Sequence, residues 1–397
     1  MLHNCTGLGT RGATRARIVI VGTILALALT IASSSMALGA SPSSIGSPAA
    51  SNVQQTIQAV LAGRAQHLVS GKSQQQANYS IPGSASMARA EASSGLVLDA
   101  RREKLRAAGE EYTGSTTRVE ISNTSVAGTV MTVTAREETE LIYKKVHGDE
   151  PPSTSYVVEH VFTFDHLDSG WTLTSDHALA TGGLAPVTEV AVELPTSAPV
   201  ADPSAASTDR RAGPLSASDK VLRPTATPAS RLSPMSIPSG LNYGNMVNYA
   251  LAHWGGAGAP YNGAYLDQSS NGGDCTNFIS QALRAGGWQD AQGLWFDNGS
   301  WWYNSQNQMT HTWINAQAWS MFAPSRTNSL GNVWDLRIAD VLQMDFNRDG
   351  AKDHTMLVTV WNSSQIYLTY HTIDTKNRSL SSILTQYPSA WYYADRT

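Results

Sequence analysis

Cys275 has the sequence surroundings of a reactive thiol. It lies near the start of the segment 272–287, GGDCTNFISQALRAGG. Apolar residues recur in this segment at helical spacing, which predicts a helix with one buried face that ends at the last two glycines. The Gly-Gly-Asp sequence before Cys275 supplies the turn and the N-cap. Cys275 is therefore expected at a helix N-terminus, where the helix dipole and free N–H groups lower the pKa of a thiol.

The chain of 397 residues has only two cysteines, Cys5 and Cys275. Residues 1–40 have the features of a secretory signal peptide, with three arginines, the uncharged run IVIVGTILALALTIA and the small-residue stretch SSSMALGAS. An uncleaved anchor is the alternative, although the run is shorter than the roughly 20 residues that cross a bilayer. Cleavage would leave a secreted, extracellular protein with one thiol. Such a thiol indicates a reactive role or intermolecular pairing, and a buried structural cysteine is the alternative.

His354 has the surroundings of the base that a nucleophilic thiol requires. It begins the apolar, β-branched segment 354–360, and the turn 362–365 leads into the alternating segment 366–371. This pattern predicts a β-hairpin that brings His371 back towards His354. Cys275, His354 and His371 would then be the nucleophile, the base and the orienting residue of a Cys-His-polar triad. Asp374 competes with His371 for the third role, and an ordinary strand-end histidine is the alternative for His354.

A second pattern, at residues 345–356, is similar to a calcium-binding loop and overlaps the strand predicted at 354–360. Asp345, Asn347, Asp349, Gly350 and Asp353 match positions 1, 3, 5, 6 and 9 of a calcium-binding loop, but position 12 is Met356 instead of a bidentate Glu. The four residues Asp345, Asn347, Asp349 and Asp353 are therefore predicted metal ligands, and an Asx-rich turn without metal is the alternative. The chemistry predicted for Cys275 requires no cofactor, so calcium would have a structural role.

Two regions of different composition must position these residues. Residues 53–190 predict a small α+β domain, with a helix at 85–108 and an antiparallel meander at 117–121, 128–135, 138–146, 156–164 and 171–175. Turns are predicted at 123–125 and 147–149. Residues 191–240 are rich in Pro, Ala, Ser and Thr and predict a flexible linker. Residues 241–397 predict a second α+β domain that begins with a helix at 243–254.

Residues around the thiol are candidates for substrate contact. Asp274 and Asn277 lie beside Cys275, and we expect both to contact the substrate. We expect the same of Trp301 and Trp302, because the second region holds ten of the eleven tryptophans and aromatic rings often line sugar- and peptide-binding clefts. Packing in the core is the alternative for these rings.

The motifs of the second region resemble those of a known family. GGDCTNFISQAL, the Trp-rich middle, DFNRDGAKDHTMLVT and YHTID are similar to the bacterial putative amidase domain family over about residues 243–391. That family is related in layout to NlpC-type and CHAP peptidases, so the resemblance implies a papain-like α+β fold and hydrolysis of an amide bond. It also implies the roles given above for Cys275, His354 and His371. In the first region, a helix followed by a meander resembles nuclear-transport-factor-like domains by element order.

Composition and motifs together limit the classes of function that fit this chain. The formal net charge of -4 gives no basis for binding nucleic acid, and a hydrophobic fraction of 41% excludes a disordered chain. We therefore expect a secreted cysteine-dependent amidase or peptidase that forms an acyl-enzyme, with no membrane association after signal cleavage. The resemblance points to the stem peptides of cell-wall peptidoglycan as substrate. The rival is a non-catalytic cell-wall or glycan-binding protein that uses the aromatic residues.

Overall fold

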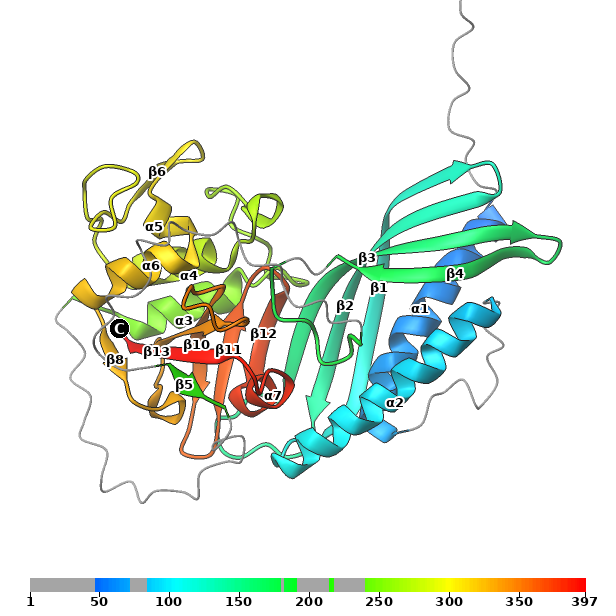
Figure 1. The fold of residues 1–397 in the computed structure, drawn as a ribbon, viewed down its shortest axis with the longest axis horizontal. Helices are drawn as coiled ribbons and strands as arrows, with labels where there is room; N and C mark the ends of the chain where they lie inside the picture. The colour runs from blue at the N-terminus through cyan, green and yellow to red at the C-terminus, as the bar shows by residue number, and fades with distance from the viewer. Residues whose placement is uncertain (1–46, 72–83, 180–181, 191–213, 218–239) are drawn as a thin grey trace, which may run out of the picture. The chain divides into compact units, whose positions relative to one another are not determined.

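The computed structural model describes residues 47–71, 84–179, 182–190, 214–217 and 240–397 (Figure 1). The predicted signal peptide at 1–40 and most of the predicted linker at 191–240 lie outside these residues. These described residues belong to one compact unit. Among the helices of the described residues, none is long and apolar enough to cross a membrane.

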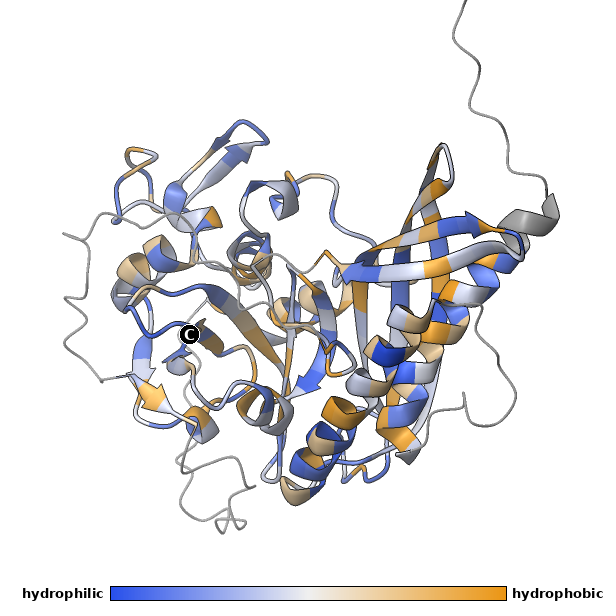
Figure 2. Cartoon of the chain, turned by 45° about the vertical axis from the view of Figure 1, so that its right-hand side comes forward, coloured by the Kyte–Doolittle hydropathy of each residue, from blue (hydrophilic) through white to orange (hydrophobic). Residues whose placement is uncertain are grey.

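Two helices cover an antiparallel meander in the N-terminal region (Figure 1). The helices are α1 (Ser47–Ser70) and α2 (Ala85–Ala107), and the strands are β1 (Tyr112–Ala127), β2 (Val130–Tyr143), β3 (Ser153–Leu167) and β4 (Gly170–Ala178). Both helices carry hydrophobic and hydrophilic residues where they are coloured (Figure 2). Ile57 and Leu61 of α1 are buried in one cluster with Val133 and Phe162 of the sheet. The helix predicted at 85–108 is confirmed by α2, which spans Ala85–Ala107.

The strands of this meander differ from the prediction in two places. Residues 128–135 and 138–146 were predicted as separate strands, but both contribute to the single strand β2. The charged residues between them have partners, because Glu137 binds His160 at 2.9 Å and Arg136 donates to the Gly255 carbonyl. The turn predicted at 123–125 is also wrong, since β1 continues past a bulge there and the chain turns at Gly128, where φ is 62°. The turn predicted at 147–149 is confirmed.

Five longer strands form the C-terminal part of the sheet, between two layers of helices. They are β9 (Val341–Asp345), β10 (His354–Trp361), β11 (Ile366–Tyr370), β12 (Asp374–Ser379) and β13 (Trp391–Arg396), in the antiparallel order β12-β11-β10-β9-β13. On one face, α3 (Tyr243–Ala252) and α4 (Cys275–Ala285) share a buried cluster with Leu357. On the other face, α7 (Leu380–Gln386) shares one with Met356. The helix predicted at 243–254 and the predicted hairpin are confirmed.

Short elements and one aromatic cluster make up the Trp-rich middle of the chain. The elements here and near the edge of the sheet are β5 (Leu215–Ser216), η4 (Ser269–Asn271), β6 (Tyr303–Ser305), β7 (Gln308–Met309), α5 (His311–Ile314), α6 (Ala316–Phe322), η5 (Ala323–Ser325), β8 (Asn328–Leu330) and η6 (Val333–Asp335). Trp301, Trp313 and Trp319 are fully buried and join the cluster on the α4 face. These rings therefore build the core that supports α4.

One sheet runs through both regions. The pairs Asp374↔Val157, Thr375↔Tyr156 and Lys376↔Ser155 join β12 of the C-terminal region to β3 of the N-terminal region. The mixed α+β class that the sequence predicts is confirmed. The two regions are also joined by this strand pairing, which no local pattern in the sequence indicates.

Candidate active site

The predicted helix around Cys275 is present as α4, and Cys275 is its first residue. Asp274 occupies the N-cap position, but its carboxylate makes no capping hydrogen bond to the helix. The Thr372 hydroxyl accepts from the N–H groups of Asp274 at 2.9 Å and Cys275 at 3.0 Å instead. Gly273 allows this close approach, because a Cβ there would lie 3.1 Å from the Thr372 oxygen. The start of α4 is therefore fixed by a residue 97 positions away in the sequence.

The Cys275 thiol is buried, with 7% of the residue exposed. Burial raises the pKa of this thiol, and the Thr276 hydroxyl and the backbone of Thr355 offset the rise only in part. The lowering that the sequence predicts from the helix N-terminus is therefore wrong for the resting protein, because desolvation of the thiolate dominates. A thiol in this state requires a base to become a nucleophile.

His371 lies on the same side of the sheet as the first turn of α4. Its ring stacks on Phe278 with a centroid separation of 3.8 Å. Nδ1 is 2.9 Å from the Asp274 carboxylate, and Nε2 is 2.9 Å from the carbonyl oxygen of His253, which follows α3. Both partners accept hydrogen bonds, so the protonated ring satisfies both. Burial alone would lower the pKa of His371, but Asp374, Asp274 and the His253 carbonyl outweigh it and raise the pKa to about 8.

His354 begins β10 as predicted, yet its ring lies on the opposite face of the sheet. Tyr370 meets it edge-on at 5.1 Å, and Phe346 lies at 6.4 Å. Neither ring nitrogen has a hydrogen-bond partner among the described residues. Burial, followed by the charge of Arg378, lowers the pKa of His354 to about 3, so the ring is neutral. The predicted hydrogen bonding of His354 by His371 is therefore wrong, and among the described residues no hydrogen bond links the Cys275 thiol to either histidine.

A bulge in the hairpin explains why the two histidines face apart. The pairing of β10 with β11 shifts by one residue between Val358 and Val360, so Thr369 lies opposite Leu357. Leu357 packs with α4, and a residue two positions along a strand points to the same face. His371 therefore falls on the α4 face, whereas His354 shares the other face with Met356. The sequence carries no signal for this bulge.

Asp374 acts on His371 rather than on His354. Burial raises the pKa of Asp374 to about 6, although the positive charge of His371 lowers it. The sequence predicts that Asp374 competes with His371 to orient His354. In the structure, Asp374 acts on His371 instead. The direct hydrogen-bond partner of that ring is Asp274, which the sequence placed in substrate contact.

Three of the four residues predicted to contact substrate are buried. Asp274 and Asn277 have no exposed surface, and the Asn277 amide donates to Tyr261, Leu266 and Asp274. Trp301 is also fully buried, and its Nε1 donates to the Ser280 hydroxyl. A substrate contact by Asn277 or Trp301 is therefore excluded in this state, because their polar groups already have partners inside the protein. Trp302 is partly exposed and stays a prediction.

A cavity of about 360 Å³ lies beside His371 and Thr372. The C-terminal region contributes Asp267, Ser269 and Asp374 to its wall, and the N-terminal region contributes Arg136 and Glu159. The cavity reaches His371 and Thr372, whose hydroxyl accepts from the Cys275 N–H, but Cys275 is not among its lining residues. Both regions of the chain therefore line it.

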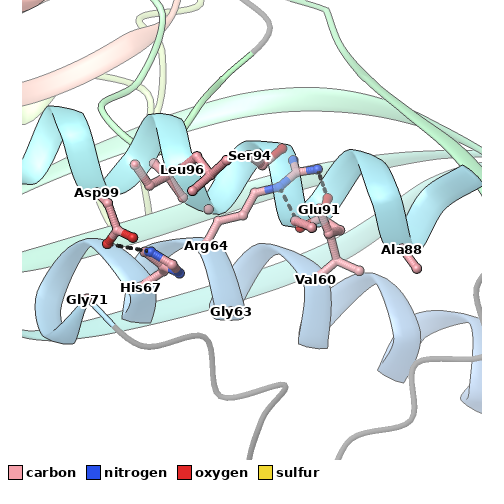
Figure 3. Close-up of a pocket in the computed structure, with 13 residues that line it drawn as sticks. Val60, Gly63, Arg64, His67, Gly71, Ala88, Glu91, Ser94, Leu96 and Asp99 are labelled. Carbon is pink, nitrogen blue, oxygen red and sulfur yellow. Dashed lines mark hydrogen bonds and ion pairs between the residues drawn. The ribbon is translucent and has the colours of Figure 1, made fainter.

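A second cavity, of about 430 Å³, lies between α1 and α2 (Figure 3). Arg64 pairs there with Glu91 at 2.5 Å, and His67 lies 2.9 Å from Asp99. Arg64 also pairs with Asp176. The charged groups of this cavity are thus bound to one another, and no cysteine lines it.

The loop predicted to bind calcium is an Asx-rich turn in this structure. The Asp345 carboxylate accepts from the N–H groups of Arg348 and Gly350, and the Asp353 carboxylate accepts from Phe346. Asn347 and Asp349 accept from backbone N–H groups within the same loop. In the part of the chain that the structure describes, no group of three His, Cys, Asp or Glu residues is arranged to hold a metal ion. Calcium binding by this loop stays a prediction.

The C-terminal region matches a known family. Residues 240–394 match the family described as "Putative amidase domain", so the resemblance inferred from the motifs is confirmed for this part of the chain. The description of that family names an amidase.

Individual relatives share only part of their length with this chain. The uncharacterized protein YhbB of Bacillus subtilis (strain 168) is 34% identical over 117 residues, which are 28% of this chain and 35% of that protein. The uncharacterized protein YjcM of the same organism is 27% identical over 116 residues, which are 26% of this chain and 25% of that protein. A crystal structure of the intermembrane space region of chloroplast protein ARC6 covers 34% of this chain and 93% of its own, at 16% identity. Its TM-score of 0.19 is too low to indicate a shared fold.

Proposed function

We propose that this chain is a secreted amidase in which Cys275 is the nucleophile and His371 transfers the proton. The observation that carries the proposal is the position of the His371 ring, which stacks on Phe278 and bonds to Asp274 at the first turn of α4. The family match of residues 240–394 supports an amide as the substrate. His354 is not given the role of base, because its ring faces the α7 side of the sheet.

In the proposed reaction, the Cys275 thiol gives its proton to Nε2 of His371 and attacks the carbonyl carbon of the amide. His371 then protonates the leaving amine, the C–N bond breaks, and the acyl group remains on Sγ as a thioester. Water gives a proton to Nε2 and hydrolyses the thioester, which restores the thiol. Asp274 accepts Nδ1–H throughout and so keeps Nε2 as the nitrogen that exchanges protons.

Two hydrogen bonds of the resting protein must open for this reaction. Nε2 of His371 donates to the His253 carbonyl, so the ring must lose that proton before it can act as a base. The N–H groups of Asp274 and Cys275 are bound by the Thr372 hydroxyl. We propose that the oxyanion of the tetrahedral intermediate takes the place of this hydroxyl, because two N–H groups at a helix start suit a developing negative charge.

The test is turnover of a peptide amide by the full chain. Purified peptidoglycan stem peptides and an unrelated peptide of the same length are incubated with the protein, and cleavage products are identified by mass spectrometry. We expect Cys275→Ala to abolish cleavage and Cys5→Ala to leave it unchanged. Cleavage that persists in Cys275→Ala overturns the mechanism. Equal cleavage of both peptides overturns the cell-wall assignment alone.

A glycan-binding role is the second candidate, and one surface feature favours it. Leu294, Trp295 and Phe296 are consecutive and about 60% exposed, and the two aromatic rings are perpendicular with a centroid separation of 5.5 Å. Exposed aromatic rings can stack on sugars. If the chain is a binder, it should sediment with insoluble peptidoglycan, and Trp295→Ala should release it while Cys275→Ala should not. Release by neither variant would remove this candidate.

A further inference from the structure

The loop 253–260, which follows α3, is bounded by the N-terminal strands. Within the loop, Gly255 donates to the Ala259 carbonyl at 2.9 Å, and Ala259 donates to the Gly256 carbonyl at 3.0 Å. Gly255 has a φ of 97°, a left-handed conformation that glycine adopts without strain. The loop is therefore a closed turn that can act as one body.

Three contacts from the N-terminal region hold this loop. Nη2 of Arg136 donates to the Gly255 carbonyl at 2.5 Å. The Glu138 carboxylate accepts from the N–H of Ala257 at 2.9 Å. Val157 of β3 is buried in a cluster with Trp254 and Ala259. The side chains of β2 and β3 thus fix the loop by a charged donor, a charged acceptor and an apolar contact.

The other side of the loop contacts His371 and Asp374. The His253 carbonyl accepts from Nε2 of His371 at 2.9 Å. The carboxylate of Asp374 lies against Gly255, since a Cβ at that glycine would lie 2.1 Å from its oxygen. Because Asp374 and the His253 carbonyl both act on the His371 ring, a shift of the loop changes the surroundings of that ring on two sides.

We propose that Arg136 is a positioning residue for His371, which acts from the N-terminal region through the loop 253–260. The inference rests on the proposed function, in which His371 transfers the proton. It assigns a role to the N-terminal region, whose strand β2 supplies the charged donor. Hydrogen bonds with a charged partner are stronger than those between neutral groups, and Arg136 makes the shorter of the two such bonds that join β2 to the loop, 2.5 Å against 2.9 Å for Glu138.

Loss of the hydrogen bond from Arg136 to the Gly255 carbonyl should change the pKa of His371. The groups that face the ring are Asp274, Asp374, the His253 carbonyl, and the rings of Tyr261 and Phe278. Arg136 lines the same cavity, and its positive charge lowers the pKa of Asp374. The carbonyl stabilises the protonated ring, so a loop that moves away destabilises it. Arg136→Ala should therefore lower the pKa of His371 below its value of about 8.

The experiment follows the histidine ring by NMR in the full chain, with His371→Gln used to assign its signal. Arg136→Ala is compared with Arg136→Lys, which keeps a charged donor, and with Arg118→Ala. Arg118 lies on the neighbouring strand β1, has a 72% exposed side chain and lies 3.9 Å from the Glu138 carboxylate without donating to the loop, so it controls for the loss of a positive charge beside Glu138. We expect the His371 titration to move to lower pH in Arg136→Ala, to stay near the wild-type value in Arg136→Lys, and to be unchanged in Arg118→Ala.

An unchanged titration in Arg136→Ala overturns the positioning role. An equal shift in Arg118→Ala also overturns it, because the effect would then be one of charge alone. If Arg136→Ala does not fold, Arg136→Gln replaces it in the same titration and is judged by the same outcomes. Peptide cleavage is measured alongside and should fall roughly 10- to 100-fold in Arg136→Ala. A shifted titration with unchanged cleavage supports the positioning role and overturns the use of His371 as base, so the two proposals fail separately.

Discussion

Each face of the C-terminal sheet holds a buried histidine, and the two faces shift the pKa of their histidine in opposite directions. On the α4 face, His371 has a hydrogen-bond partner for each ring nitrogen and a pKa raised to about 8. On the α7 face, His354 has no partner for either nitrogen and a pKa lowered to about 3. His354 begins β10 and His371 directly follows the neighbouring strand β11, so the surroundings on each face decide the difference.

The order of residues in a motif therefore does not decide which histidine is available for chemistry. A base must hold one nitrogen fixed while the other exchanges a proton, and this requires a polar partner. Asp274 is such a partner, and it stands next to Cys275 in the chain. A neutral imidazole among aromatic rings, such as His354, is instead part of the packing.

The largest expected effect is that of removing the histidine on the α4 face. His371→Ala should lower kcat/KM for peptide cleavage by roughly 10²- to 10⁴-fold, the contribution of a general acid–base group. The measurement is steady-state cleavage, with circular dichroism as a check that the variant is folded. Cleavage within threefold of wild type would show that another group takes the proton.

A smaller effect is expected from the partner of that histidine. Asp274→Asn removes the negative charge that fixes Nδ1–H, so it should lower the maximal rate roughly 100-fold. It should also lower the pKa of His371, because the protonated ring loses a stabilising carboxylate. The rise of activity with pH, which in the wild type should follow deprotonation of His371 near pH 8, should then occur at lower pH. A pH–rate profile tests both parts, and an unchanged midpoint would contradict the role of Asp274.

The same histidine should make stability depend on pH. The pKa of His371 is about 8 in the folded chain, against 6.5 for an ordinary histidine. Its contribution is therefore fully present below pH 6.5 and is lost as the pH rises through about 8, with a magnitude of about 2 kcal/mol. Urea unfolding at pH 6 and pH 9 measures this loss, and His371→Gln should lack it. A wild type and a His371→Gln variant that lose the same amount of stability would contradict the assigned pKa.

The smallest expected effect on activity is that of His354. His354→Leu replaces an imidazole without partners by an apolar side chain, so cleavage should stay within about threefold of wild type and the free energy of unfolding should change by less than about 1 kcal/mol. Met356→Ala, a truncation on the same face, is the control and should cost about 2–5 kcal/mol. A large loss of cleavage in a folded His354→Leu protein would return the role of base to His354.

Local patterns in the sequence predict much of this fold. Apolar spacing and the glycines after Ala285 predict α4 and place Cys275 at its start, because these signals lie within one helix. The hairpin of β10 and β11 is predicted by its alternation and its turn. The pairing of β3 with β12 is not predicted, since it joins residues more than 200 positions apart in the sequence.

The candidate site is predicted less well than the fold. Residue type and spacing single out Cys275, His354 and His371 as candidates, but the face on which each histidine lies depends on one bulge in β10. The roles of Asp274 and Thr372 depend on contacts across the sheet that the sequence does not signal. Trp301 is in the core rather than in a cleft, because nothing in a run of aromatic residues tells which ring is buried.

The most direct test of the central claim, that His371 rather than His354 serves Cys275, is the rate of Cys275 alkylation by iodoacetamide as a function of pH. The rate is read on the peptide that contains Cys275, because Cys5 is also present in the chain. We predict that alkylation of the wild type rises through about pH 8, where His371 loses its proton and can accept that of the thiol. His371→Ala should move the rise to higher pH, because burial then leaves the pKa of the thiol raised, and His354→Leu should leave it in place. A rise that moves in His354→Leu and stays in His371→Ala would contradict the account.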